Sequence, residues 1–380
     1  MTETDPAAEL HPRPDDAPGD AIERHLRRPL TRRRFLLRAT QVGLAVGAAG
    51  IGIGGYLVQQ RASPWDASVF PPPGRSSVAV LRAPRYEADL EAIVRQALRL
   101  LQVDVRGRSV LLKPNIVEFD PAAAINTDPR LVAATAAAMR SAGARQVTVG
   151  EGSGHRRDAH FIAGQSGLLD LLEDIDVPFV DLNTTAIGRV QLHSRFTSLG
   201  ELWLPAPVTK ADLVVSMPKL KTHHWGGVTL SLKNMFGTVP GRIYGWPKNV
   251  LHWAGLEESI LDVAAAVRPQ LAIVDGIVGM QGDGPIKGDA VDVGVIIAGT
   301  DPVAVDSTAA RLMGIDPERV GYLEEAGRFL GQLTPELIDQ LGEEPEGEAV
   351  LFELLPQFST LRIGSPLPAD DPAPADNTGA

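Results

Sequence analysis

The stretch LVVSMPKLKTHHWGGVTLSLKNMFG, residues 213–237, joins an apolar run to a dense group of lysine and histidine side chains. Similar short apolar runs recur along the chain and alternate with amphipathic helical segments. This alternation predicts an α/β fold with parallel strand pairs. Because ligands of such folds bind beyond the carboxyl ends of the strands, the stretch predicts both a central strand and the place of a site.

The chain from Val78 onward follows the same alternation. We expect strands at residues 78–81, 109–113, 146–150, 177–182, 213–216, 271–275 and 291–298, with helices in most of the gaps. Helix starts are predicted where a capping Asp precedes a proline, at Asp128-Pro129, Asp301-Pro302 and Asp316-Pro317. The expected fold class is a predominantly parallel sheet with flanking helices, built as one lobe or two.

Four of the predicted strands end in polar residues. These endings hold Lys113 and Asn115, then Glu151 and Gly152, then Lys219, Lys221 and His223, and finally Asp275. Parallel strands present their carboxyl ends at one edge of a sheet, so we expect these residues to line one shared cleft. The glycines at 150–154 offer backbone N–H groups that could cradle an anion.

Lys219, Lys221 and His223 alternate as strand residues do, so we expect them on one face of the strand. Three cationic or titratable groups on one face repel each other unless an anion or carboxylates compensate them. The sequence therefore predicts that Lys219 and Lys221 clamp a carboxylate or phosphate, with His223 as general acid or base. Asp275 and Glu151 would orient these groups or bind a metal.

Further residues complete the predicted site. Ligand-binding candidates are Lys113, Asn115, Gly152, Lys233, Asn234 and His252, and metal-binding candidates are Glu151, Asp275 and Asp306. Asp306 is a candidate because a carboxyl group within an apolar helix requires a base or a ligand as its partner. Residues 241–253 are rich in Gly, Trp and Pro and are expected to form an irregular loop or lid. Trp246 and Trp253 within it either cover a pocket or fill the core.

Composition limits the kinds of partner and cofactor. The 380-residue chain has a net charge of −11 and no cysteine. The negative charge argues against nucleic-acid binding, and the absence of cysteine excludes a cysteine-ligated iron–sulfur cluster, a disulfide and a cysteine nucleophile. A divalent metal would need His, Asp, Glu or Asn ligands. Without the first 62 residues the chain has 27 basic and 40 acidic side chains, a net charge of −13, so a basic cluster stands out.

The N-terminal region has the features of an export signal. Residues 1–30 read as a disordered cytoplasmic tail, and TRRRFLL at 31–37 resembles a twin-arginine signal recognised by that export machinery. The uncharged run at 39–58 is long enough to cross a bilayer, and residues 31–62 are predicted to form an uncleaved anchor in preference to a cleaved signal. Arginines before this run predict a cytoplasmic N-terminus and an extracytoplasmic main domain.

The rest of the chain divides into three predicted parts. Residues 63–77 are expected to form a stiff Pro-rich linker, and residues 78–341 the α/β domain. Residues 342–380 are expected to hold a loop, an edge strand at 358–363 and a disordered tail.

Several motifs together resemble a family known as domain of unknown function 362. They are Lys113-Pro114-Asn115, Gly150-Glu151-Gly152, PKLKTH at 218–223, LKNMFG at 232–237, Val274-Asp275-Gly276 and DPVAVD at 301–306. The likeness covers residues 78–314. It implies no general activity, and the iron–sulfur label of cysteine-bearing relatives does not transfer to this cysteine-free chain.

Two classes of function fit these observations. One is an enzyme that acts on an anionic small molecule, and the other is a membrane-tethered protein that captures an anionic ligand or metal without turnover. A structural role in the cell envelope is a third alternative.

Overall fold

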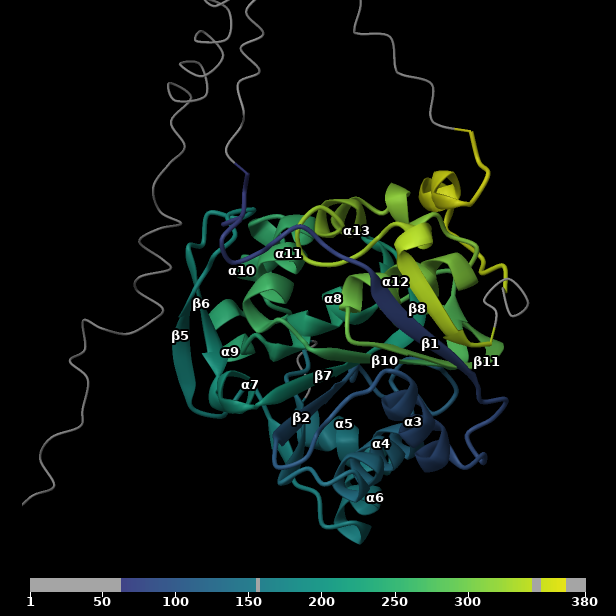
Figure 1. Cartoon of the computed structure of the whole chain (residues 1–380). Coiled ribbons are helices and arrows are strands. Elements are labelled where there is room, and N and C mark those ends of the chain that lie inside the picture. Colours follow the sequence, from purple (N-terminus) through teal and green to yellow (C-terminus); the bar gives the residue numbers. More distant parts are fainter. Residues whose placement is uncertain (1–62, 155–157, 344–349, 367–380) are drawn as a thin grey trace, which may run out of the picture. The chain divides into compact units, whose positions relative to one another are not determined.

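A mostly parallel β-sheet forms the centre of the protein (Figure 1). The computed structural model describes residues 63–154, 158–343 and 350–366. In sheet order, the strands are β12 (Ile338–Gly342), β1 (Ser76–Arg82), β11 (Asp289–Gly299), β10 (Leu271–Gln281), β7 (Leu213–Met217), β2 (Ser109–Pro114), β3 (Gln146–Glu151) and β4 (Phe179–Asp181). β8 (Lys219–His223) pairs parallel with β10 and antiparallel with β9 (Gly227–Thr229). The predicted fold class is confirmed.

The order of the strands explains why their sequences are so apolar. β10, β7, β2, β3 and β4 are consecutive parallel neighbours, and helices cover them on both sides. A parallel strand covered on both faces has no solvent side, so it reads as a continuous apolar run. All five residues of β7 are buried, as the LVVSM run predicts. β11 joins β1 and β10 by antiparallel pairing, which makes the sheet mixed at this side.

Helices cover the two faces of the sheet (Figure 1). One group packs below it in that view: α3 (Leu90–Leu100), α4 (Pro129–Ser141), α5 (Ala159–Gln165) and α6 (Leu168–Asp174). The other group lies above it: α8 (Ser231–Asn234), α10 (Asn249–Trp253), α11 (Leu256–Val267), α12 (Pro302–Leu312) and α13 (Gly321–Ala326). Shorter elements are α7 (Ala206–Lys210), α9 (Gly241–Tyr244) and the hairpin of β5 (Ile187–Gln191) and β6 (Glu201–Pro205).

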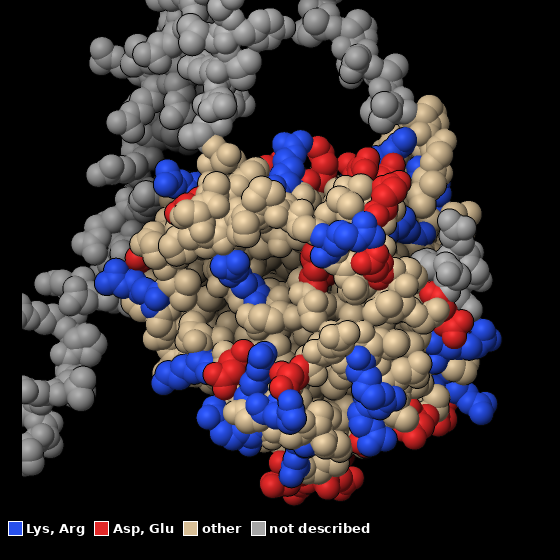
Figure 2. Space-filling view, in the orientation of Figure 1, with Lys and Arg blue, Asp and Glu red and all other residues tan. Residues whose placement is uncertain are grey.

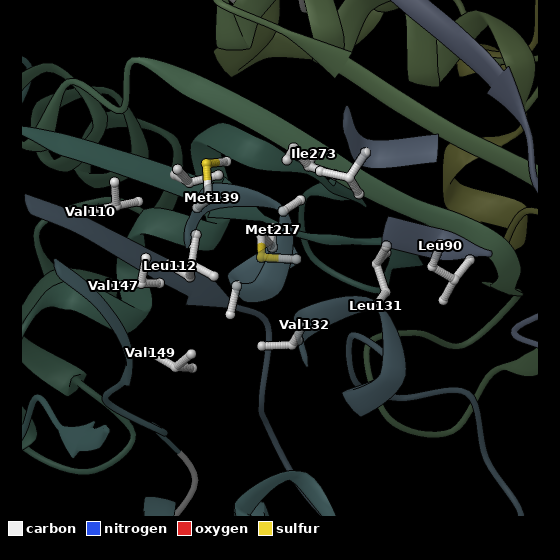
Figure 3. Close-up of a cluster of buried hydrophobic side chains, with 14 of the residues drawn as sticks. Leu90, Val110, Leu112, Leu131, Val132, Met139, Val147, Val149, Met217 and Ile273 are labelled. Carbon is white, nitrogen blue, oxygen red and sulfur yellow. The ribbon is translucent and has the colours of Figure 1, made fainter. Parts of the chain in front are cut away.

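The core beneath the sheet joins α3 and α4 to the central strands (Figure 3). Leu90 of α3 and Met139 of α4 pack in one buried cluster with Leu112, Val149 and Met217 of the sheet. The predicted caps at Asp128 and Asp301 are confirmed, because each side chain accepts backbone N–H groups of the helix that follows. The cluster and caps hold the strand ends of this sheet at fixed positions.

Several predicted boundaries need correction. β10 continues to Gln281 across an irregularity near Gly276, six residues beyond the strand end predicted at Asp275. Asp316 caps only the short 3-10 turn Pro317–Arg319, and the edge strand expected at 358–363 is largely the 3-10 helix Pro356–Leu361. In each case pairing or packing with distant segments decided the outcome, and these contacts leave no periodic signal in the sequence.

The expected linker is part of the folded body from residue 63 onward. Trp65 stacks on Phe329 at 4.8 Å between ring centroids and pairs with Ser194 through a β-bridge. The described residues from Ser63 onward group as one compact unit and are not divided into two lobes. The predicted anchor at 31–62 lies outside the described residues. Among the helices that are described, none is both long and apolar enough to cross a membrane.

Asp262 of α11 fixes the loop that receives this N-terminal segment. The buried carboxylate accepts from Ser194 Oγ at 2.6 Å, from Thr197 Oγ1 at 2.6 Å and from Thr197 N at 2.8 Å. We expect Asp262→Ala to lower the free energy of unfolding by roughly 3 kcal/mol, because buried donors lose their acceptor. Urea unfolding would measure this. Glu173→Ala, at an exposed position of α6, is the control, and equal stability of the two variants would contradict the assignment.

Candidate functional site

A pocket of about 260 Å³ opens where the carboxyl ends of β2 and β3 meet β8, β9, α8 and α10. It is bordered by most of the residues predicted from sequence: Lys113, Asn115, Glu151, Gly152, Lys221, His223, Lys233, Asn234 and His252. The sheet therefore brings together three of the four polar strand endings. Lys219, Asp275 and Asp306 do not border the pocket.

An ion pair between Lys113 and Glu151 joins the ends of β2 and β3. Lys113 Nζ donates to Glu151 Oε2 at 2.8 Å, and both side chains are almost fully buried. Burial lowers the pKa of Lys113, and the negative charge of Glu151 opposes that shift. The carboxylate also accepts from the backbone N–H groups of Ile116 and Gly152, each at 2.8 Å. Because both of its oxygens accept hydrogen bonds, Glu151 anchors the ends of β2 and β3 to each other.

The N–H group of Gly152 was expected to cradle a bound anion. The structure shows that the anion it binds is the carboxylate of Glu151. Positions 152 and 237 leave no room for a side chain. A backbone carbonyl lies very close to Gly152, and the Lys113–Glu151 ion pair lies very close to Gly237. A Cβ atom on Gly152 would lie 2.6 Å from the carbonyl oxygen of Gly237.

Asn234 connects this ion pair to α8. Its Oδ1 accepts from Lys113 Nζ at 2.8 Å, while its Nδ2 donates to the Lys113 carbonyl at 3.0 Å and to Ser216 Oγ at 3.1 Å. Asn115 Nδ2 also donates to Asn234 Oδ1, at 3.3 Å. The predicted Lys113, Asn115 and Asn234 thus form one buried hydrogen-bonded network at the pocket.

Lys221 and His223 reach the pocket from β8. Lys221 Nζ donates to the carbonyl oxygens of Ile125 at 2.7 Å and Pro285 at 3.2 Å. Burial, with the nearby positive charge of Lys233 as the next cause, lowers the pKa of Lys221 well below its ordinary value. The same two causes lower the pKa of His223. Its Nδ1 accepts from the N–H groups of Trp225 at 3.0 Å and Gly226 at 3.2 Å.

Two more lysines and a histidine complete the cationic lining. Burial lowers the pKa of Lys233 to about 8 and that of Lys248 to about 7. Lys248 Nζ donates to the carbonyl oxygens of Gly152 and Phe236, each at 2.7 Å. His252 Nδ1 lies 3.1 Å from the Lys248 carbonyl oxygen, and burial lowers the pKa of this imidazole.

The pocket has a pronounced charge imbalance. Lys113, Lys221, Lys233 and Lys248 line it, whereas Glu151 is the only acid among the lining residues that the structure describes. The molecular surface differs from this, because basic and acidic side chains lie interspersed on the face shown in Figure 2. A concentration of ammonium groups with one carboxylate favours an anion as the missing partner.

Lys219 has a different role from the predicted anion clamp. Its Nζ donates to Asp275 Oδ2 at 3.0 Å and to the Tyr86 hydroxyl at 2.7 Å. Asp275 also accepts from Tyr86 at 2.8 Å and from the N–H of Asp128 at 2.8 Å. Lys219 and Asp275 therefore neutralise each other inside the fold. The alternation along β8 was predicted correctly, but the neighbouring β10 supplied a carboxylate for one of the two lysines.

Asp306 supports the pocket from outside. Its carboxylate accepts from the N–H groups of Ser231 at 2.7 Å and Leu232 at 2.9 Å, at the start of the short helix that carries Lys233 and Asn234. Burial raises the pKa of Asp306 to about 8. These contacts give Asp306 a positioning role in place of the predicted metal role.

The predicted metal ligands Glu151, Asp275 and Asp306 do not come together. Within the described ranges, the one group of three metal-ligating side chains is Asp158, His160 and Asp181, whose ligand atoms lie within 4.8 Å of one another. Carboxylate and imidazole ligands of this kind suit a divalent cation. Asp158 also caps α5 through the N–H of His160 at 2.8 Å, so a structural role accounts for one member.

Sequence reasoning missed several pocket residues, of which Lys248 is the most important. Lys248 lies in the segment 241–253, which was expected to be an irregular loop or lid but forms α9 and α10 with a short connection between them. The segment borders the pocket through Pro247, Lys248 and His252. The tryptophans emphasised there do not line it, and Trp253 is 72% exposed. Lys248 has a positive φ of 66°, and only its tertiary position distinguishes it from a surface lysine. Trp225, Phe236 and Thr229 were also missed, although all three lie within or beside the quoted motifs.

Comparison with known proteins identifies related sequences. The profile of a family described as a domain of unknown function (DUF362) matches residues 110–311. A thylakoid-associated protein of Synechocystis sp. is 33% identical over 258 residues, covering 64% of this chain and 76% of that protein.

Comparison with solved structures finds partial, distant matches. The lactate racemase apoprotein of Thermoanaerobacterium thermosaccharolyticum has 16% identity and a TM-score of 0.36, over 65% of this chain and 58% of its own. A Thermotoga maritima protein has 10% identity and a TM-score of 0.33, over 58% of each chain. The chain thus spans less than two thirds of both structures. Likenesses this distant bear on neither the site nor the function.

Gly237 offers a test of how closely the anchor is packed. A Cβ atom at this position would collide with Glu151 Oε1 and Lys113 Nζ. We expect Gly237→Ala to separate the buried ion pair and to lower the free energy of unfolding by roughly 3 kcal/mol or more. Chemical denaturation would measure this, with Gly74→Ala as control because a Cβ atom there meets nothing within 4 Å. Unchanged stability of Gly237→Ala would show that the pair is not held as described.

Proposed function

Because this chain belongs to the DUF362 family, whose description names no activity, we propose a function from its pocket: it binds an anionic small molecule and acts on it as an enzyme. The observation that carries this proposal is the excess of buried lysines over carboxylates in the lining. The one acid, Glu151, is already engaged by Lys113 and two backbone N–H groups. The other three lysines have no carboxylate partner in the lining.

These three lysines retain hydrogen-bonding capacity for a ligand. An ammonium group has three N–H donors. Lys221 and Lys248 each direct two of them to carbonyl oxygens, which leaves one. Lys233 has no hydrogen-bond acceptor among the described residues, and its Nζ lies 5.8 Å from the centre of the Phe236 ring. A bound anion would accept from these donors and offset the burial and the repulsion that lower their pKa values.

Two histidines in the lining favour chemistry over simple capture. His223 Nδ1 accepts from two backbone N–H groups, so the neutral ring carries its proton on Nε2. His252 Nδ1 faces a carbonyl oxygen, so the neutral ring carries its proton on Nδ1 and offers a lone pair on Nε2. His223 thus offers a hydrogen-bond donor, and His252 offers a lone pair that can accept a proton. Capture requires only the lysines, whereas a positioned lone pair of this kind serves general base catalysis.

Sulfate binding tests the proposal, because the charge of sulfate is constant near neutral pH. We expect titration calorimetry to show binding that weakens as pH rises through 7 and 8, the pKa values of Lys248 and Lys233. Above pH 7 to 8 the two lysines are deprotonated in the ligand-free protein and must take up protons when sulfate binds. The affinity for sulfate therefore falls by up to about tenfold per pH unit for each proton taken up. Below pH 7 both lysines are protonated in either state and the slope disappears.

Matched variants separate the roles of the pocket residues. Lys233→Met and Lys248→Met should weaken sulfate binding at least tenfold, whereas the exposed Lys210→Met should not. His252→Gln should retain affinity if this imidazole serves chemistry. Binding that is absent at every pH, or that is unaffected by both pocket lysines, would contradict the proposed anion site.

We also propose that residues 31–62 direct export by the twin-arginine route and anchor the protein in the membrane, with the pocket on the extracytoplasmic side. Support comes from the TRRRFLL motif, the uncharged run that follows it and the arginine excess before that run. A relative that is described as thylakoid-associated agrees with membrane association.

Cell fractionation tests this second proposal. The full chain should sediment with membranes and be digested by protease added to spheroplasts. Conservative replacement of the twin arginines, Arg32→Lys with Arg33→Lys, should keep the protein in the cytoplasm, because the export machinery reads the guanidinium pair. The control is Arg27→Lys with Arg28→Lys, which preserves the same total charge. Retention of both double variants, or of neither, would contradict the assignment.

A further inference from the structure

Two residues that line the pocket have a buried oxygen atom with no hydrogen-bond partner in the described structure. They are Asn115, through Oδ1, and Thr229, through Oγ1. Both residues are more than nine-tenths buried, at 8% and 3% exposure. Buried polar atoms without a partner are rare in folded proteins because each one costs free energy. Their position at the pocket points to a ligand atom as the missing partner.

The orientation of the Asn115 amide follows from its neighbours. Lys113 Nζ can only donate and the Lys113 carbonyl can only accept, so the two bonds to Lys113 fix which end of the Asn234 amide is oxygen. The oxygen of Asn234 faces Asn115, and therefore Asn115 must present its NH₂ group to it. Asn115 Oδ1 is then directed away from Asn234. The buried ion pair thus determines, through two amides, that a residue of the pocket lining has an acceptor without a partner among the described residues.

A purely anionic ligand does not complete this arrangement. Sulfate or a simple carboxylate offers acceptors to the lysines but no donor to Asn115 Oδ1. We propose that the ligand is an anion that also carries a hydrogen-bond donor, a hydroxyl or N–H group, which Asn115 Oδ1 accepts. This inference rests on the proposed anion-binding function and narrows its ligand class. Hydroxy acids and phosphate groups that retain a proton share this chemistry.

Thr229 places a second polar atom beside the charged part of the site. It is the register partner of Lys221 in the β8–β9 ladder. Its hydroxyl both donates and accepts, so it satisfies either the anionic group or the donor group of the ligand. The pocket therefore combines lysine donors, one obligatory acceptor and one adaptable hydroxyl. A ligand with both kinds of group matches all three.

Two pairs of nearly isosteric probes test the inference. At pH 7.5 phosphate retains a proton and sulfate has none, and hydroxymalonate differs from malonate by one hydroxyl group. We expect phosphate to bind at least ten times more tightly than sulfate, and hydroxymalonate at least ten times more tightly than malonate, in titration calorimetry. The reason is that sulfate and malonate have no donor for Asn115 Oδ1 and leave this buried acceptor unpaired.

Variants show whether Asn115 is responsible. Asn115→Ala should bring both affinity ratios close to one while leaving sulfate and malonate affinities within about threefold of wild type. Thr229→Val is a second variant with an intact Asn115 and should retain a preference. Thr135→Val is the matched control, since Thr135 Oγ1 is also buried without a partner but lies on α4, outside the pocket lining. Circular dichroism confirms that each variant is folded.

The outcomes distinguish this inference from the function on which it rests. If none of the four probes binds, the proposed anion site is wrong. If all bind with ratios near one, the anion site stands and the inference is overturned. A preference in both pairs, lost in Asn115→Ala, supports the inference. A preference in one pair alone supports it and identifies the ligand group as phosphate or hydroxy acid. A preference that survives Asn115→Ala overturns the role of Asn115.

Discussion

The site depends on one buried ion pair, Lys113 with Glu151. It joins the carboxyl ends of two adjacent parallel strands, and three further groups hold its members: the N–H groups of Ile116 and Gly152, and the side chain of Asn234. Breaking such a pair leaves an uncompensated buried charge, which is strongly destabilising. The pair also affects the proposed ligand site, because it orients the Asn234 amide and, through Asn234, the Asn115 amide.

The described part of the chain contains two kinds of buried or partly buried lysine, which differ in whether a carboxylate neutralises them. Lys113 and Lys219 each have a carboxylate partner within 3.0 Å, Glu151 and Asp275. Lys221, Lys233 and Lys248 have none in the pocket lining, and burial lowers the pKa of each. Burying charge without compensation is costly, so the presence of three such groups at one opening supports the proposed anion site.

Much of this arrangement was predictable. Central parallel strands bury both faces, so β2, β3 and β7 appear as short apolar runs, and polar residues directly after them fall at the sheet edge where sites form. Asp–Pro pairs marked the starts of α4 and α12 because capping is a local interaction. Partners were not predictable. Lys219 and Lys221 are equivalent along β8, and only the approach of β10 and Tyr86 separates their roles. The role of Lys248 could not be predicted from the sequence, because its two acceptors, the carbonyl oxygens of Gly152 and Phe236, lie 96 and 12 residues away along the chain.

The sequence by itself determined the α/β class, the central strands, the edge of the sheet that carries the site and the residue types available there. Periodicity, helix caps and strand endings depend on residues that are close in sequence, so a single sequence is enough to recognise them. The tertiary structure decided which lysines are neutralised, which amide oxygen is left without a partner and which backbone groups the buried carboxylates hold. These outcomes depend on which groups from distant segments lie within about 3 Å of one another, and hydrogen bonds and ion pairs form only at that range.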